Sequence, residues 1–528
     1  MRTSRPVLGS LLLSAALSGP AFAQQPPAPH GPSATTSSGV QAGATPDSFT
    51  LQLKAQAVVL DVVVTNAKGE IVTNLGKDDF QVLEDKVPQV IRTLDSPASH
   101  APAKDIPIHS TAELDRLEPN APVTLIVLDE INTPFGDEAF ARDSLKKFLD
   151  RQGETLQQPT LLGAVDLTHF MLLHDYTTSR QDILSALDHH FAAYPWHMDG
   201  ASWKADQFNA SFASLIEIAE ATRGHSGHKS LIWVGRGFPP FDPTTLPEQF
   251  NEGLKQVIES CTDALTDARV ALYTLDPAGI SMAPEEVDAD GFVGDPFGGQ
   301  IDFNVMAEAT GGHAFFGRND VDKLIAASAR DGAGFYTLTY APAVARTDAK
   351  EFRSIRVVMK DPSLHAATRQ GYYSRGVSAS GPAKVVLKGQ NRQIFDLGLA
   401  AQSVLVYDAV HIDVQRVAGP SGQFRLVLNS ADLAWHEAGA RKLDAKITVI
   451  AETFDSKGNA LDLTSKLSTL QVGEASVPNT PDSATVSLFD NIPTKPSATR
   501  IRFVVRDETN RKIGAVNFDL NGVNKGTR

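Results

Sequence analysis

The stretch VTLIVLD at residues 123–129 determines the fold class that the sequence predicts, because it is almost entirely apolar up to its final aspartate. A continuous apolar run, in contrast to an alternating one, is typical of a strand that is covered on both faces. Similar runs recur at LLGAVDL (161–167), LIWV (231–234) and VALYTL (270–275). Amphipathic stretches separate these runs and predict helices at 137–150, 180–190, 212–222, 247–268, 303–309 and 321–329. Strands alternating with helices favour β-α-β crossovers, so we predict an α/β domain over residues 119–332 with a doubly wound, mostly parallel sheet.

Strand patterns flank this domain on both sides. Residues 49–95 contain VVLDVVVT (58–65), and residues 333–375 contain FYTLTY (335–340), each with a one-sided apolar face that needs a cover. Each segment offers only about three strands, which is marginal for an independent sheet. We therefore predict that the two segments form one split β-sandwich into which the α/β domain is inserted. Many short strands with turn residues between them predict a separate C-terminal β-sandwich at residues 383–522.

The N-terminus has the features of an export signal. Two arginines precede the apolar run at 7–17, and AFA at 21–23 matches the small-x-small cleavage pattern. We predict a signal peptide at residues 1–23 and a disordered linker at 24–48, which is rich in Pro, Gly, Ser and Thr. The chain is therefore expected in the periplasm or outside the cell, and we expect no transmembrane segment in it.

Composition restricts the classes of partner. The chain has 48 Lys+Arg and 62 Asp+Glu, a formal net charge of −14. An acidic chain of this kind argues against nucleic acid as a partner, because phosphate recognition needs clustered basic residues. Cys261 is the single cysteine, so an intrachain disulfide is impossible.

Six phrases in order carry a family resemblance. They are VVVTNAKGEIVTNLGKDDFQVLEDKVPQVI, TLIVLDEINTPF, ATRGHSGHKSLIWVGRGFP, ARVALYTLDPAGI, AEATGGHAFF and GFYTLTYAP, and they span roughly residues 58–375. On these phrases the chain resembles the secreted von Willebrand factor A-related proteins found in Acidobacteria. The resemblance implies a doubly wound sheet with ligands at the C-terminal ends of the strands. The split sandwich predicted from the strand patterns has a parallel in integrins, whose A-like domains are inserted in the same way.

The resemblance further implies a metal-ion-dependent adhesion site, in which oxygen ligands hold a divalent cation such as Mg²⁺. In the loop DEINT (129–133), Asp129 matches the family pattern and Thr133 can replace a serine, but Ile131 stands where a further oxygen ligand belongs. Ser202 is the candidate for the hydroxyl from the second loop. Arg236 stands where the family places an aspartate, and its charge is wrong for a cation site.

We therefore predict a degenerate metal site. Asp129 and Thr133 are the remaining candidate ligands, and Asn132 or Asp242 would restore part of the coordination. No cofactor is expected, and neither Mg²⁺ nor Ca²⁺ is expected to bind tightly. A sharper hypothesis places the Arg236 guanidinium in the cation position, where it would neutralise Asp129.

Three classes of function remain open. The first is a non-enzymatic protein that mediates protein–protein interaction or adhesion, binding an unidentified protein partner around Asp129, Asn132, Thr133, Ser202 and Arg236. The alternative is a cell-envelope hydrolase that uses a carboxylate–histidine pair, or a structural envelope component. A hydrolase should have a deep pocket with converging titratable groups, whereas a binding module should present a shallow face.

Overall fold

The computed structural model describes residues 57–102, 106–166, 170–192, 201–238, 248–279, 303–342, 352–373, 391–417, 422–438, 442–473 and 485–520. The predicted signal peptide, the predicted linker and Asp242 lie outside these residues. The described part is mixed α/β with more strand than helix. Among its helices, none combines the length and the apolar character needed to cross a membrane.

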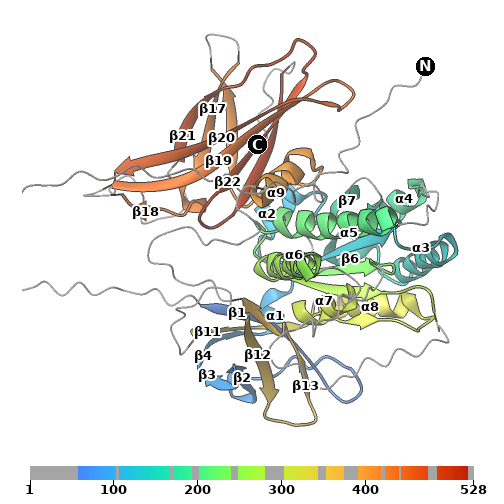
Figure 1. The fold of residues 1–528 in the computed structure, drawn as a ribbon. Helices are drawn as coiled ribbons and strands as arrows, with labels where there is room; N and C mark the ends of the chain where they lie inside the picture. Colours follow the sequence, from blue (N-terminus) through green and yellow to red (C-terminus); the bar gives the residue numbers. More distant parts are fainter. Residues whose placement is uncertain are drawn as a thin grey trace, which may run out of the picture. The chain divides into compact units, whose positions relative to one another are not determined.

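A six-stranded mixed sheet forms the α/β part, with the strand order β10-β9-β8-β5-β6-β7. Figure 1 labels β6 and β7 of this sheet and the helices α3 to α8 around it. Its central strand β5 (Val123–Asp129) runs parallel to β6 (Thr155–Val165) and β8 (Lys229–Val234). The parallel strands continue through β9 (Val270–Leu275) and β10 (Ala314–Phe315), and β7 (Phe170–Ser179) is the antiparallel edge strand.

Helices cover both faces of this sheet, as the unbroken apolar runs predict. On β5, Leu125 and Val127 belong to the core shared with α5 (Ala201–Ala221), α6 (Glu248–Asp267) and α7 (Phe303–Thr310). The alternate residues Ile126 and Leu128 pack with α3 (Phe135–Asp150), α4 (Arg180–His189) and α8 (Val321–Asp331). Helix α5 starts at Ala201, well before the predicted start at 212. The predicted second loop around Ser202 is therefore already helical.

The two flanking β segments pair with each other. One four-stranded sheet has the order β13-β1-β11-β4, and the second has the order β14-β12-β2-β3. The first segment supplies β1 (Val58–Thr65), β2 (Phe80–Glu84), β3 (Val87–Gln89) and β4 (Ile91–Asp95). The second segment supplies β11 (Phe335–Tyr340), β12 (Phe352–Met359), β13 (His365–Ala367) and β14 (Gly371–Tyr373).

Each of these sheets takes strands from both segments, so neither segment completes a sheet alone. β1 pairs with β11 from Val58↔Tyr340 to Val63↔Phe335, and β2 pairs with β12. The predicted apolar faces meet in one core that contains Leu60 and Leu338. The backbone pairing that the split sandwich requires is thus present. A short 3-10 helix η1 (Lys77–Asp79) precedes β2, and helices α1 (Pro97–His100) and α2 (Thr111–Leu117) lie between β4 and β5.

The C-terminal region contains two sheets that pack around one core. The larger sheet contains β15 (Tyr407–Asp408), β18 (His436–Glu437), β19 (Lys442–Phe454), β20 (Ala460–Gly473), β22 (Arg500–Asp507) and β23 (Ile513–Asp519). The smaller sheet contains β16 (Ile412–Arg416), β17 (Gln423–Asn429) and β21 (Thr485–Asn491), and the 3-10 helix η3 (Ser430–Asp432) follows β17.

Helix α9 (Asn391–Gln402) precedes these strands and was not predicted from the sequence. Its residues Leu397 and Ala400 join the same core as Leu215 of α5. Ser403 donates a hydrogen bond of 2.5 Å to the buried Glu217 of α5. Helix α9 therefore shares a core with the α/β part, whereas the sequence predicted a separate C-terminal sandwich at residues 383–522.

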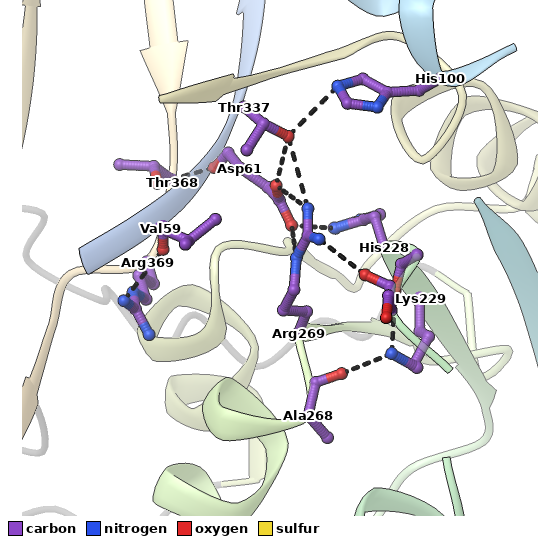
Figure 2. A network of polar contacts seen from close by, with 12 residues as sticks. Val59, Asp61, His100, His228, Lys229, Ala268, Arg269, Thr337, Thr368 and Arg369 are labelled. Carbon is purple, nitrogen blue, oxygen red and sulfur yellow. Dashed lines mark hydrogen bonds and ion pairs between the residues drawn. The ribbon is translucent and has the colours of Figure 1, made fainter. Parts of the chain in front are cut away.

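A polar network joins the split sandwich to the α/β part (Figure 2). Asp61 on β1 accepts hydrogen bonds from Arg269 Nη2 at 2.6 Å and Arg269 Nε at 3.1 Å, and its Oδ2 lies 2.9 Å from His228 Nδ1. Thr337 on β11 donates to Asp61 Oδ1 at 3.0 Å. Burial raises the pKa of the Asp61 carboxyl, but Arg269 and His228 outweigh it and hold this pKa well below its usual value.

Two further features of this network concern Lys229 and the backbone at Arg269. Lys229 is fully buried, and its Nζ donates to the carbonyl oxygens of His225, Gly227 and Ala268 at 2.6, 2.8 and 2.7 Å (Figure 2). Burial and the nearby Arg269 charge lower the pKa of Lys229 to about 7. Arg269 itself has φ = 57° just after α6, a left-handed position where glycine is usual. An arginine there accepts backbone strain, and its side chain reaches Asp61.

Candidate functional site

The candidate site lies at the topological switch point of the sheet. The chain passes from β5 to β6 on one side, and it later returns to β8 on the other side of β5. The C-terminal ends of β5 and β8 therefore face loops that leave in opposite directions, which is where ligands bind in doubly wound sheets. Asp129 ends β5, and the loop Gly235-Arg236-Gly237 follows β8.

Asp129 is only 1% exposed and is surrounded by nitrogen donors. Its Oδ1 accepts from the Asn132 backbone at 3.0 Å and from Asn132 Nδ2 at 2.9 Å. Its Oδ2 accepts from Trp233 Nε1 at 3.0 Å and from the Gly237 backbone at 2.8 Å. Burial raises the pKa of this carboxyl, while these hydrogen bonds oppose the rise. These N–H groups therefore stabilise the Asp129 carboxylate in place of a bound cation.

Among the described side chains, the hydroxyl beside Asn132 belongs to Ser211, whereas the sequence predicted Ser202. Asn132 Nδ2 lies 3.1 Å from Ser211 Oγ, and Ser211 donates to the Gln207 carbonyl one turn earlier on α5. Ser202 lies in the first turn of α5. The sequence carried no signal for Ser211, because α5 was predicted to start after it.

Arg236 does not neutralise Asp129, so the sharper hypothesis is wrong. Its Nη2 donates to Asp137 at 2.8 Å, and its Nε lies 3.8 Å from Asp276. The Arg236 side chain is 44% exposed and reaches two partly exposed carboxylates at lower desolvation cost than the buried Asp129. Asp129 needs no further donor, because Trp233 and the backbone already supply its hydrogen bonds.

The glycines around Arg236 are required by close approach. Gly235 has φ = +151°, and a Cβ there would lie 2.3 Å from Asp129 Cβ and 2.5 Å from Thr133 Oγ1. Gly237 has φ = +67°, and a Cβ there would meet the Phe303 ring at 2.2 Å. The loop can therefore bring its N–H groups to Asp129 only with glycine at both positions.

These residues do not fit a divalent cation. Ile131 is 3% exposed and packs in the apolar core. Thr133 Oγ1 accepts from the Arg236 backbone at 3.2 Å, and both Asp129 oxygens accept N–H groups. Within the described ranges, no three His, Cys, Asp or Glu side chains are grouped to hold a metal. Mg²⁺ requires oxygen ligands in an octahedral arrangement with an open position. The loop at residues 129–133 does not supply this arrangement.

A second polar cluster, next to Asp129, was missed by sequence reasoning. Glu130 Oε1 lies 2.6 Å from His190 Nε2, and both side chains are largely buried. Glu138 lies 3.8 Å from Arg142, and burial followed by the Glu130 charge raises the pKa of Glu138. This cluster ties the end of α4 to the end of β5. The only available signal was the run Asp129-Glu130, which by spacing alone resembles an ordinary loop.

Exposed aromatic side chains occur at the same end of the sheet, where the parallel strands terminate. Among the side chains that the structure describes, three phenylalanines are more than half exposed: Phe135 at 67%, Phe191 at 85% and Phe316 at 52%. Phe135 starts α3 after β5, and Phe316 directly follows β10. Phe191 follows His190, which contacts Glu130 at the end of β5. All three therefore belong to the end of the sheet where the parallel strands terminate.

Comparisons with known proteins give no family. No family model matches the chain, and no curated protein matches it. Among solved structures, the chain is similar to a calcium-binding mutant (D341A D367A) of Bacteroides uniformis β-glucuronidase 2, with 15% identity and a TM-score of 0.11. That similarity covers 21% of this chain and 13% of the glucuronidase chain, and at this TM-score it supports no argument about fold or function.

Proposed function

We propose that the chain is an exported, von Willebrand A-type protein that binds a protein partner without a metal ion. The binding face in this proposal is the end of the sheet formed by the C-terminal ends of β5, β8 and β10. The interaction is of the adhesion class, and the protein is not an enzyme. The arrangement of parallel strands between two helical layers supports this, as does the position of Asp129 at the switch point.

The observation that carries the proposal is the presence of three phenylalanines, each more than half exposed, at the C-terminal end of the parallel sheet: Phe135, Phe191 and Phe316. Large exposed aromatic side chains are costly to leave in water, and they are enriched among the residues that dominate binding energy. Arg236 lies at the same end of the sheet, and its side chain is 44% exposed. Aromatic and arginine side chains together are the composition expected of the centre of a protein interface.

The metal-free character follows from the Asp129 shell. An adhesion-type cation bridges to a carboxylate of the partner, which requires an open coordination position. Here the Asp129 oxygens accept from Trp233, Asn132 and Gly237, and the residue at the next ligand position is Ile131. The Asp129 cluster thus shapes the loops that carry Phe135 and Arg236, and the proposed partner contacts those side chains.

A hydrolase remains the rival because a carboxylate–histidine pair does exist at Glu130 and His190. In the described part of the chain, however, the remaining contacts of this pair are structural. The His190 carbonyl accepts from Arg142 at 2.7 Å, and the Glu130 side chain is 1% exposed. A general base with so little access to substrate does not fit the hydrolase reading.

The test is capture from envelope extract by the immobilised mature protein, compared with two variants. The double variant Phe191→Ser/Phe316→Ser removes two exposed rings, and Val90→Ser removes an exposed side chain from the split sandwich, where Val90 is 79% exposed. We expect a partner that wild type and Val90→Ser retain, and that the double variant binds about 30-fold more weakly. EDTA should leave the capture unchanged. Retention by the double variant, or loss of capture in EDTA, would refute the proposal.

A further inference from the structure

The longest strand of the C-terminal sandwich lies at the edge of its sheet. β20 (Ala460–Gly473) has 14 residues and pairs with β19 along its whole length (Figure 1). In the part of the chain that the structure describes, β19 is the only strand that pairs with β20. Across the described residues, the opposite edge of β20 pairs with no other strand over about 45 Å, at about 3.3 Å per residue. Near its start, Lys495 Nζ donates to the Leu461 carbonyl at 3.3 Å.

Among the described residues, this edge has few of the features with which proteins usually prevent pairing. Residues 460–473 (ALDLTSKLSTLQVG) contain no proline and a single lysine. The only irregularity in its pairing with β19 lies next to the turn, between Thr453 and Phe454. Leu463 and Leu467 are 52% and 67% exposed on the same face of the strand. Long, regular and partly apolar edges are templates for adding another strand.

We propose that β20 pairs antiparallel with β20 of a second copy of this chain, around a two-fold axis at Ser465. In that register Leu463 of each copy lies opposite Leu467 of the other, so the Leu463–Leu467 pair occurs twice across the interface. A two-fold interface needs a surface that complements itself, and this spacing supplies one. Cross-strand pairs of this kind are the unit that stabilises antiparallel sheets.

The charges on the other face of β20 are also self-complementary. In the same register Asp462 lies opposite Ser468, and Lys466 of the second copy is its diagonal neighbour, within reach of a long side chain. No like charges face each other between 462 and 468. Asp462 also contacts Lys495 of its own chain at 2.8 Å, which places a second cation beside this carboxylate. The occupant that the edge fits is thus another copy of itself.

The first experiment measures the mass of the mature protein in solution at tens of micromolar by light scattering. We expect twice the monomer mass for wild type, and the monomer mass for Leu467→Lys, which would place a lysine opposite Leu463. Val90→Lys is the matched control, because it adds the same charge at an exposed valine of the split sandwich. This control should remain dimeric. A monomeric wild type, or a dimeric Leu467→Lys, would overturn the proposal.

A cysteine at the two-fold axis tests the register. Cys261 is buried, so Ser465→Cys introduces an accessible thiol that faces its own copy, at a Cβ–Cβ distance of about 5 Å. Ser468→Cys is the control, because the two copies of residue 468 would lie about 20 Å apart along the strands. We expect Ser465→Cys to form a disulfide-linked dimer under mild oxidation and Ser468→Cys to remain largely unlinked. Equal rates of cross-linking in the two variants would contradict this register.

Discussion

Replacing Asp61 with asparagine is expected to loosen the split sandwich from the α/β part. The Asp61 side chain is 12% exposed and the Arg269 side chain 29%, so this pair is mostly desolvated. Removing one member of a buried pair costs about 3–5 kcal/mol, because the other charge stays unpaired in the interior. The partial exposure of Arg269 places the expected cost at the lower end, about 3 kcal/mol. The amide that replaces the carboxylate would also turn one N–H group toward the donors that now surround it.

The measurement is hydrogen exchange of the backbone amides of β1 (Val58–Thr65), which reports the free energy of opening this strand. Asp78→Asn is the matched control, since Asp78 is exposed and its replacement should change stability by less than about 0.5 kcal/mol. Arg269→Lys provides a second variant, which keeps the charge but loses the two-pronged contact. We expect its effect to be smaller than that of Asp61→Asn.

The depressed pKa of Asp61 determines how the stability that it contributes changes with pH. The pKa of Asp61 is depressed in the folded protein, so the unfolded chain takes up a proton near its ordinary pKa of about 3.9 while the folded chain does not. The stabilisation from this carboxylate is therefore complete above about pH 5 and is lost as the pH falls below 4. The difference between wild type and Asp61→Asn should shrink from pH 7 to pH 3.5. A difference below about 0.5 kcal/mol at pH 7, or one that does not shrink, would refute this account.

Three further predictions concern other parts of the chain. Gly235→Ala should lower the free energy of unfolding by about 2–4 kcal/mol in urea titrations, because its Cβ would lie 2.3 Å from Asp129 Cβ. Gly136→Ala is the control and should not destabilise the protein, because a Cβ at Gly136 meets no atom within 4 Å. Burial and then Asp115 raise the pKa of Asp408 to about 8. The stability that its protonated carboxyl contributes is therefore lost as the pH rises through 8. The melting temperature of wild type should fall between pH 6 and 9 more than that of Asp408→Asn. Mass spectrometry of the exported protein should give a mature N-terminus at Gln24, and a retained Met1 would contradict the signal peptide.

The sequence predicted best those features that depend on periodicity. The apolar run on β5 indicated burial on both faces, and Leu125 and Ile126 do belong to cores on opposite faces of the sheet. The one-sided patterns around Leu60 and Leu338 indicated a shared core, because an exposed apolar face must be covered by some other element. Both inferences need only the direction of side chains along a strand, which alternates in any sheet.

The features that the sequence missed depend on which of several possible partners a side chain chooses. Arg236 had Asp129, Asp137 and Asp276 within a plausible reach, and the choice depends on the burial of each carboxylate, which sequence spacing does not give. Ser211 was missed because the start of α5 was placed too late. Helix α9 lies in a region whose other elements are strands, and its apolar residues pack against α5, which is distant in sequence.

The positions of the Asp61 network and of the proposed binding face bear on how binding would be transmitted. Lys229 starts β8 and Arg269 precedes β9, so the network lies at the N-terminal ends of the parallel strands, while Asp129 lies at the C-terminal end of β5. A strand of seven residues separates these ends by about 20 Å. The network is therefore too distant to contact a partner at the proposed face. The chain enters β5 at Val123 and leaves α8 before β11, so the two covalent connections and the Asp61–Arg269 pair together restrict rotation of the α/β part against the sandwich. A pull on the proposed binding face would be shared by the Asp61–Arg269 pair, by the hydrogen bond from the Gln370 N–H to the Ala309 carbonyl, and by the covalent connections, which all join the two parts.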